Sequence, residues 1–523
     1  MVTRLSPRDA MYYFLDDSRS TTHLGALLIV DPAAVPRPDS PSAPATDAGA
    51  GGNGQSGKTS GRHGTARPKG AGHDGTGPNG TGPAVSPRPL DYVSLVSLVE
   101  NRLQRVPRYR QLVREVTFGL ARPVWIDDPD FDINFHIRRA GLPRPGGPAD
   151  LAELVSRVMS RPLDRTRPLW EMYLIEGLAD GRLAILTKSH RCLIDEHEGH
   201  PEISEVICDA TAQPEVLPEE LWMPGSPPGG TSLVIGALAE ALARPGDLVE
   251  TVIHGNGVVA EARSVVSGTL RRIGDVVGQL TDSAPRSPLN NSGTTTRSFI
   301  TSSVPRRECA KIAEHHNCTV NDVELAIISG VMRKWLLSVD PAAAPADTVR
   351  VVVPLSTRDP GVEIEAGAEP SWIPVGKPSF VTDLPVGEAN PTVRLAQVAG
   401  LADRYAQSSR RMSTGPSPWF PELGVVPFPD ISSRAFRSLD SRSYNVPVAM
   451  STAPISDRYV LGVPVRELYF VPVLVSQRAL SISVVEYGDR LQFAFVADRG
   501  VIGDLPAMAD YVLESYEELL TTD

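Results

Sequence analysis

The sequence contains no run of about 18 uncharged apolar residues, which is the length that a transmembrane helix requires. Its opening stretch, MVTRLSPRDAMYYFLDD, carries acidic side chains where a secretory signal would carry an apolar core. We therefore expect a cytoplasmic protein, and any contact with a membrane must be peripheral.

Cysteine and positive charge are also scarce. The chain has four cysteines (Cys192, Cys208, Cys309 and Cys318), and none forms a Cys-x-x-Cys pair, so we expect free thiols rather than a disulfide framework. Lysine and arginine number 51 against 62 aspartates and glutamates, which gives a formal net charge of −11. Nucleic-acid binding requires a clustered cationic surface that neutralises phosphates, so nucleic acid is not expected as a partner.

Residues 36–89 lack the apolar side chains that a folded segment needs. Val85 is their single large aliphatic residue, and they contain no aromatic residue. Such a segment cannot bury enough apolar surface to offset its ordering entropy, so we predict a disordered insertion. The G-x-G-x-x-G at 75–80 follows no predicted strand and opens no predicted helix, so it does not indicate a dinucleotide site.

At 523 residues the chain is too long for one compact core, which suggests two domains. Strand and helix patterns alternate on both sides of a proline-rich stretch at 214–228. We predict strands and helices at 22–31, 91–106, 122–128, 131–140, 149–160, 170–178 and 182–191, and again at 298–304, 307–316, 321–339, 348–356, 478–499 and 504–520. The expected fold is mixed α/β, with residues 1–215 and 298–523 as two halves and 216–297 as a helical crossover.

Histidine, acidic and cysteine side chains are concentrated at 189–200, SHRCLIDEHEGH, at the end of a predicted strand. A metal site there would draw on His190, His197 and His200 with Glu196 or Glu198. The histidine spacings of seven and three do not fit the H-E-x-x-H pattern of zinc enzymes, so we expect no metal. Nucleophilic catalysis by Ser189 is disfavoured because neighbours on a strand point to opposite faces, and the chain has no G-x-S-x-G elbow.

The surrounding segments support a third interpretation. Pro168-Leu169-Trp170-Glu171 precedes Lys188-Ser189-His190-Arg191 by about twenty residues, and Asp195 follows. With LSPRDAMYYFLDD, LARPVWIDDPDFDINFHIR, TVNDVELA, VVVPLSTR and LQFAFVADR in the same order, the chain resembles the bacterial wax ester synthase/diacylglycerol acyltransferase family over almost all of its length outside 36–89.

This resemblance implies two halves similar to chloramphenicol acetyltransferase with a solvent channel between them. It also implies transfer of a fatty acyl group from acyl-CoA, a co-substrate, to a long-chain alcohol or a diacylglycerol, without a further cofactor. Peripheral contact with the inner membrane or with lipid inclusions would fit such substrates. In the family's H-H-x-x-x-D-G motif the second histidine is the general base, and the aspartate holds the motif loop.

The motif is degenerate in this chain. His190 is its first histidine, Arg191 stands where the base is expected, and Glu196 follows Asp195 in place of glycine. A guanidinium has no acceptor atom and stays protonated, so it cannot be a general base, and losing a base typically costs about 10²–10⁴ in rate. We expect His190 to be a packing residue. Restoring histidine at 191 and glycine at 196 is expected to raise turnover.

Other motif residues are intact. Pro168, Leu169 and Trp170 match the family, and Trp170 is expected to fill a core. Asn321 and Asp322 also match, with Asn321 expected to cap a helix that begins at Asp322. Two functions stay open from the sequence: an O-acyltransferase with altered chemistry, or a catalytically impaired acyltransferase-like protein that binds lipid, acyl-CoA or an active relative.

Overall fold

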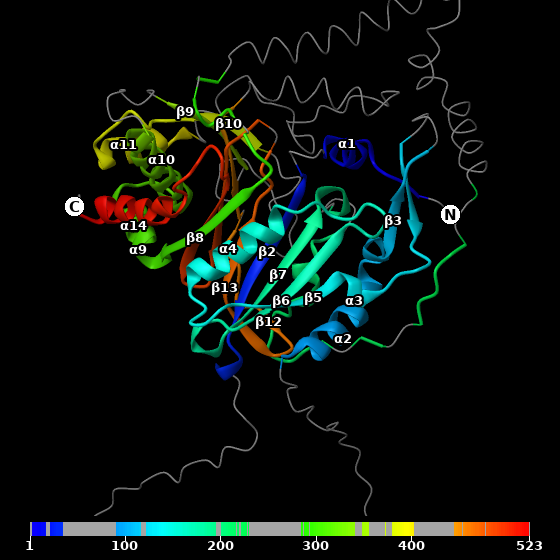
Figure 1. Ribbon diagram of the computed structural model, residues 1–523. Coiled ribbons are helices and arrows are strands. Elements are labelled where there is room, and N and C mark those ends of the chain that lie inside the picture. Colours follow the sequence, from blue (N-terminus) through cyan, green and yellow to red (C-terminus); the bar gives the residue numbers. More distant parts are fainter. Residues whose placement is uncertain are drawn as a thin grey trace, which may run out of the picture.

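Two mixed six-stranded sheets and a small three-stranded sheet make up the fold (Figure 1). The computed structural model describes residues 3–16, 21–34, 90–116, 122–194, 200–215, 217–218, 221–226, 229, 284–285, 287–291, 293–339, 348–354, 372, 379–401, 444–451, 453–475 and 477–521. The predicted insertion at 36–89 and residues 230–283 of the predicted crossover lie outside the described residues.

The first sheet has the strand order β12-β13-β2-β7-β6-β5. Its strands are β2 (His23–Val30), β5 (Ile137–Gly141), β6 (Trp170–Glu176), β7 (Leu183–His190), β12 (Tyr459–Val460) and β13 (Val463–Val471). Neighbouring strands are antiparallel except β5 and β6, which are parallel.

The second sheet has the order β10-β9-β11-β14-β15-β8. Its strands are β8 (Arg297–Pro305), β9 (Val349–Pro354), β10 (Ser379–Leu384), β11 (Val446–Met450), β14 (Leu480–Tyr487) and β15 (Arg490–Asp498). Here β11 runs parallel to both β9 and β14. The mixed α/β class with two sheet-containing halves is therefore confirmed.

The boundary expected at residue 298 does not separate the two sheets. Strands β12 and β13 come from the C-terminal part of the chain, yet β13 pairs with β2 along 465–471, so in Figure 1 the orange β13 lies beside the blue β2. This pairing gives β2 a hydrogen-bonded neighbour on both sides, which spares it an exposed edge. The two halves are therefore interlocked.

Helices cover the sheets. The N-terminal region contributes α1 (Pro7–Leu15), α2 (Tyr92–Arg102), α3 (Ile133–His136), α4 (Pro148–Met159) and α5 (Ile203–Ile207), and the C-terminal region contributes α9 (Arg306–His315), α10 (Val320–Val339), α11 (Pro391–Val398) and α14 (Pro506–Leu520). The small sheet joins β1 (Thr3–Arg4), β4 (Val124–Asp127) and β3 (Gln111–Arg114). Among the described helices, none is long and apolar enough to cross a membrane.

One predicted strand is partly wrong. Residues 131–140 were expected to be extended, but 133–136 form the helical turn α3 before β5 begins. The Asp132 carboxylate accepts a hydrogen bond from the Asn134 amide at 2.9 Å, which caps this turn. A capping aspartate therefore overrides the alternating pattern at this point.

Three large apolar clusters hold the layers together, and a small one lies in the three-stranded sheet. One, which we call the N-terminal core, packs the N-terminal helices on the first sheet and reaches Val485 and Tyr487 of β14. A second lies between the second sheet and helices α9, α10 and α14. The third joins the two sheets and α4, and we call it the inter-sheet cluster; it includes Leu27, Ile29, Val155, Leu186, Tyr469, Phe299 and Val496. Because side chains alternate along a strand, β2 and β7 each present one face to this cluster and the other face to the N-terminal core.

Candidate active site

Pairing of β6 with β7 brings two of the recognised motifs together. Trp170 lies opposite Ser189, and the His190 amide donates a hydrogen bond to the Leu169 carbonyl at 2.9 Å. The Trp170 amide in turn donates to the Pro168 carbonyl at 2.9 Å. The Pro-Leu-Trp segment is therefore backbone-bonded to the end of the strand that carries the histidine.

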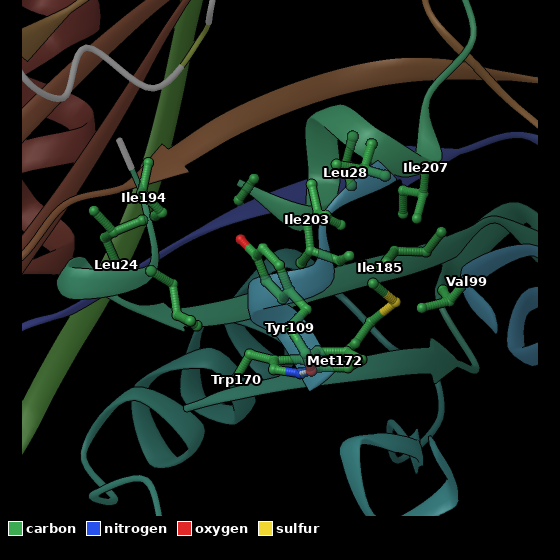
Figure 2. Packing of buried hydrophobic residues seen from close by; sticks show 14 of the residues in the cluster. Leu24, Leu28, Val99, Tyr109, Trp170, Met172, Ile185, Ile194, Ile203 and Ile207 are labelled. Carbon is green, nitrogen blue, oxygen red and sulfur yellow. Dashed lines mark hydrogen bonds between the residues drawn. The ribbon is translucent and has the colours of Figure 1, made fainter. Parts of the chain in front are cut away.

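Trp170 fills the core, as expected from the sequence. Its side chain is fully buried, and its Nε1 donates to the Tyr109 carbonyl at 2.7 Å. Its ring stacks on His136, with centroids 4.6 Å apart and planes inclined by 10°. Figure 2 shows Trp170 and Tyr109 packed among Met172 and the surrounding apolar residues. The buried Trp170 ring therefore fixes the start of β6, which pairs with the end of β7 that carries His190.

His190 is held through both ring nitrogens. Its Nδ1 accepts from the Cys192 amide at 3.1 Å, which assigns the ring proton to Nε2, 2.9 Å from the Thr22 hydroxyl. The Asp16 carboxylate lies 3.7 Å from Nε2. Burial alone would raise the pKa of Asp16, but the His190 imidazole and the hydrogen bond from the Thr22 amide outweigh it and hold the pKa at about 2. With both nitrogens engaged, His190 positions the turn and offers no unused lone pair.

Ser189 points to the opposite face of β7, as the strand alternation predicts. Its hydroxyl donates to the Glu202 carboxylate at 2.7 Å inside the N-terminal core. Burial raises the pKa of Glu202, while hydrogen bonds from Ser204 and Ser189 oppose that rise. Ser189 and His190 therefore do not form a nucleophile–base pair.

Arg191 is buried in a single 3₁₀ turn over Arg191–Leu193. Its backbone amide donates to the Thr22 carbonyl at 2.9 Å, and its guanidinium donates to the Ile194 carbonyl at 2.6 Å. The guanidinium also lies over the Tyr12 ring, 4.6 Å from the centroid, a favourable cation–π arrangement. The contact with Tyr12 attaches this turn to α1, and the two hydrogen bonds fix the turn itself.

A buried carboxyl on α1 accompanies that cation. Asp9 is fully buried, and burial raises its pKa to about 6 although the positive charge of Arg191, the Ser6 hydroxyl and the Arg108 guanidinium lower it. The Arg108 guanidinium lies 3.7 Å from the Asp9 carboxylate. Arg191 therefore lies close to a buried charged pair, Asp9 and Arg108.

The structure describes only some of the remaining candidate residues at 195–200. Asp195, Glu196, His197 and Glu198 lie outside the described residues, so the loop-holding role expected for Asp195 stays a prediction. His200 is half-buried. Within the described ranges, no group of three or more potential ligands could hold a metal ion.

The expected cap at Asn321 is wrong. Helix α10 already begins at Val320, and Thr319 forms its cap with Asp322. The Asp322 carboxylate accepts from the amide and the hydroxyl of Thr319, both at 2.8 Å, and the Thr319 hydroxyl accepts from the Asp322 amide at 3.2 Å. This reciprocal pair is the Thr-x-x-Asp capping signal, which is legible in the sequence.

Sequence reasoning also missed His23. This residue begins β2 directly opposite His190, and their ring centroids lie 6.4 Å apart. The approach depends on Gly25, because a Cβ there would lie 1.9 Å from the Thr187 carbonyl oxygen of β7. The sequence does show a histidine at the start of a buried strand. It does not show that His190 lies opposite, because strand pairing joins distant segments.

Comparison with known families decides the classification. The wax ester synthase/diacylglycerol acyltransferase catalytic domain matches residues 77–324, and the C-terminal domain of the same family matches residues 379–520. The chain belongs to this family. A probable diacylglycerol O-acyltransferase of Mycobacterium tuberculosis, tgs3, is 36% identical over 320 residues, which are 61% of this chain and 98% of the relative. Another from the same organism, tgs1, is 28% identical and covers 82% of this chain and 88% of its own length.

Solved structures support the fold. The wax ester synthase/diacylglycerol acyltransferase from Marinobacter aquaeolei VT8 superposes with a TM-score of 0.61 at 20% identity, covering 99% of this chain and 98% of that one. The first condensation domain of the calcium-dependent antibiotic synthetase gives a TM-score of 0.50 at 15% identity, covering 99% and 97%. At these identities the likeness concerns architecture, and it agrees with the two-halved acyltransferase fold.

Proposed function

We propose that this family member is an acyl-CoA-dependent O-acyltransferase that moves a fatty acyl group to a long-chain alcohol or a diacylglycerol, without a base at position 191. Family membership carries this proposal, together with curated relatives named diacylglycerol O-acyltransferases. The proposal is also supported by the proximity of residues 168–170 and His190, which resemble family motifs in sequence.

The reaction needs a proton acceptor. The acceptor alcohol is a weak nucleophile, and it attacks a thioester efficiently only if its proton is removed as the new bond forms. Arg191 has no acceptor atom, and its guanidinium is occupied by Ile194 and Tyr12. An active enzyme must therefore place another acceptor near the hydroxyl.

A second candidate function has its own support. Arg191 provides structural contacts, and both nitrogens of His190 are engaged. A protein with this arrangement and no other base would bind acyl-CoA or lipid without turning it over. Recognition of the long substrate uses the walls of a binding channel, so binding does not require the base.

One pair of measurements separates the two functions. Free CoA released from palmitoyl-CoA, with hexadecanol or dioleoylglycerol as acceptor, reports transfer, and calorimetry with palmitoyl-CoA reports binding. Release that depends on the acceptor supports the transferase. Micromolar binding without release supports the binding protein, and neither signal from a folded sample would contradict both.

A further inference from the structure

The first residue of β2 is a buried imidazole without a hydrogen bond. His23 is 2% exposed, and neither Nδ1 nor Nε2 has a partner among the described residues. Of the three buried histidines in the described ranges, His136 uses Nδ1 and His190 uses both nitrogens. Buried polar groups are nearly always paired, because leaving one unpaired costs free energy, so two unused nitrogens need an explanation.

His23 lies at the junction of the two halves. It shares its face of β2 with Leu27 and Ile29, which belong to the inter-sheet cluster. Arg297, the first residue of β8 in the second sheet, is one of the charges that lower the pKa of His23. His23 therefore lies on the face of β2 that points toward the second sheet, four residues before Leu27 and outside the inter-sheet cluster. The family resemblance leads us to expect the substrate channel between the two halves.

The neighbouring candidates are already occupied. Lys188, on the same face of β7, directs its ammonium to the Val158 carbonyl at 2.9 Å and to the Arg161 carbonyl at the end of α4. His190 has no unused lone pair. Burial first, and then the charge of Lys188, lower the pKa of His23, so its ring is neutral at neutral pH and can accept a proton.

We propose that His23 is the general base of acyl transfer in this chain, a role that position 191 cannot fill. This proposal rests on the transferase function proposed above. The acceptor hydroxyl would lie against an imidazole nitrogen of His23 and give up its proton as its oxygen attacks the thioester carbonyl carbon. The carbon–sulfur bond then breaks, and the CoA thiolate takes the proton back from His23. The products are the ester and free CoA, with no acyl-enzyme.

The missing hydrogen bonds make the test unusually direct. Replacing His23 with leucine removes no bond that the described structure makes, so the melting temperature should stay the same or rise. Activity should fall, because the proton acceptor is lost. A structural histidine would behave in the opposite way, with stability lost and turnover of the folded protein retained.

The experiment compares the parent chain with His23→Leu and His23→Gln, and uses His136→Gln as a matched control at another buried imidazole. Melting temperature, palmitoyl-CoA affinity and acceptor-dependent CoA release are measured for each. We expect both His23 variants to bind palmitoyl-CoA as the parent does while kcat falls about 100-fold or more. His136→Gln should melt lower and keep its kcat, because it loses the bond to the Trp170 carbonyl.

Chemical rescue adds a readout that a structural role would not move. Imidazole added to His23→Ala should restore part of the turnover, whereas pyrrole should not, because pyrrole has the same shape but no acceptor nitrogen. His23 variants that turn over like an active parent would overturn this proposal and leave the transferase function intact. A His23→Leu chain that unfolds would also overturn it. A parent that binds palmitoyl-CoA but never releases CoA would contradict both the base and the transferase.

Discussion

Replacing Asp9 with asparagine should stabilise the protein at pH 8, because the parent must keep a buried carboxylate charged. Burial raises the pKa of Asp9 from its ordinary 3.8 to about 6 in the folded protein. The folded state therefore holds the proton more tightly than the unfolded chain, and stability falls as pH rises from about 4 to about 6. One pH unit is worth about 1.4 kcal/mol, so the charged carboxylate costs about 3 kcal/mol at pH 8.

An amide of the same shape avoids this cost at every pH. The gain from Asp9→Asn should be about 3 kcal/mol at pH 8, about half of that at pH 5, and close to zero below pH 4. Urea denaturation at these pH values, followed by tryptophan fluorescence, gives the free energies of unfolding. Asp510→Asn, at an exposed position on α14, is the control and should change little.

Two results would refute this reasoning. A gain of equal size at pH 5 and pH 8 would show that the carboxyl does not titrate in this range. A loss of stability at pH 8 would show that the positive charges of Arg191 and Arg108 stabilise the carboxylate by more than burial penalises it. In that case the buried cation at position 191 would depend on Asp9 as its counter-ion.

The other two predictions concern the motif residues. Trp170→Ala should lower the free energy of unfolding by about 3–5 kcal/mol in urea denaturation, because a fully buried ring stacked on His136 is removed; a loss below about 1 kcal/mol would contradict its anchoring role. The sequence alone predicts that Arg191→His with Glu196→Gly raises CoA release. The structure instead predicts a lower melting temperature and no gain, because the guanidinium holds Ile194 and Tyr12 and the proposed base is His23. A tenfold gain in CoA release would show that the general base acts from position 191 and would contradict this prediction.

Much of the architecture was legible along the chain. The apolar runs at 22–31 and 182–191 became β2 and β7, and the helical pattern at 149–160 became α4. These elements follow from local periodicity, which the sequence carries residue by residue. The wrong assignment of the helix cap to Asn321 could also have been avoided from local sequence, because Thr319 and Asp322 have the spacing of a capping pair.

The sequence by itself determined the family, the two α/β halves and the presence of an arginine at position 191. It could not show which groups surround that position, because they come from distant segments: Thr22 contacts His190 across 168 residues, and β13 enters the first sheet from the C-terminal part of the chain. Only strand pairing placed His23 beside His190, and only packing turned Arg191 onto Tyr12. Side-chain chemistry is local information, whereas the availability of a lone pair depends on neighbours that the tertiary fold supplies.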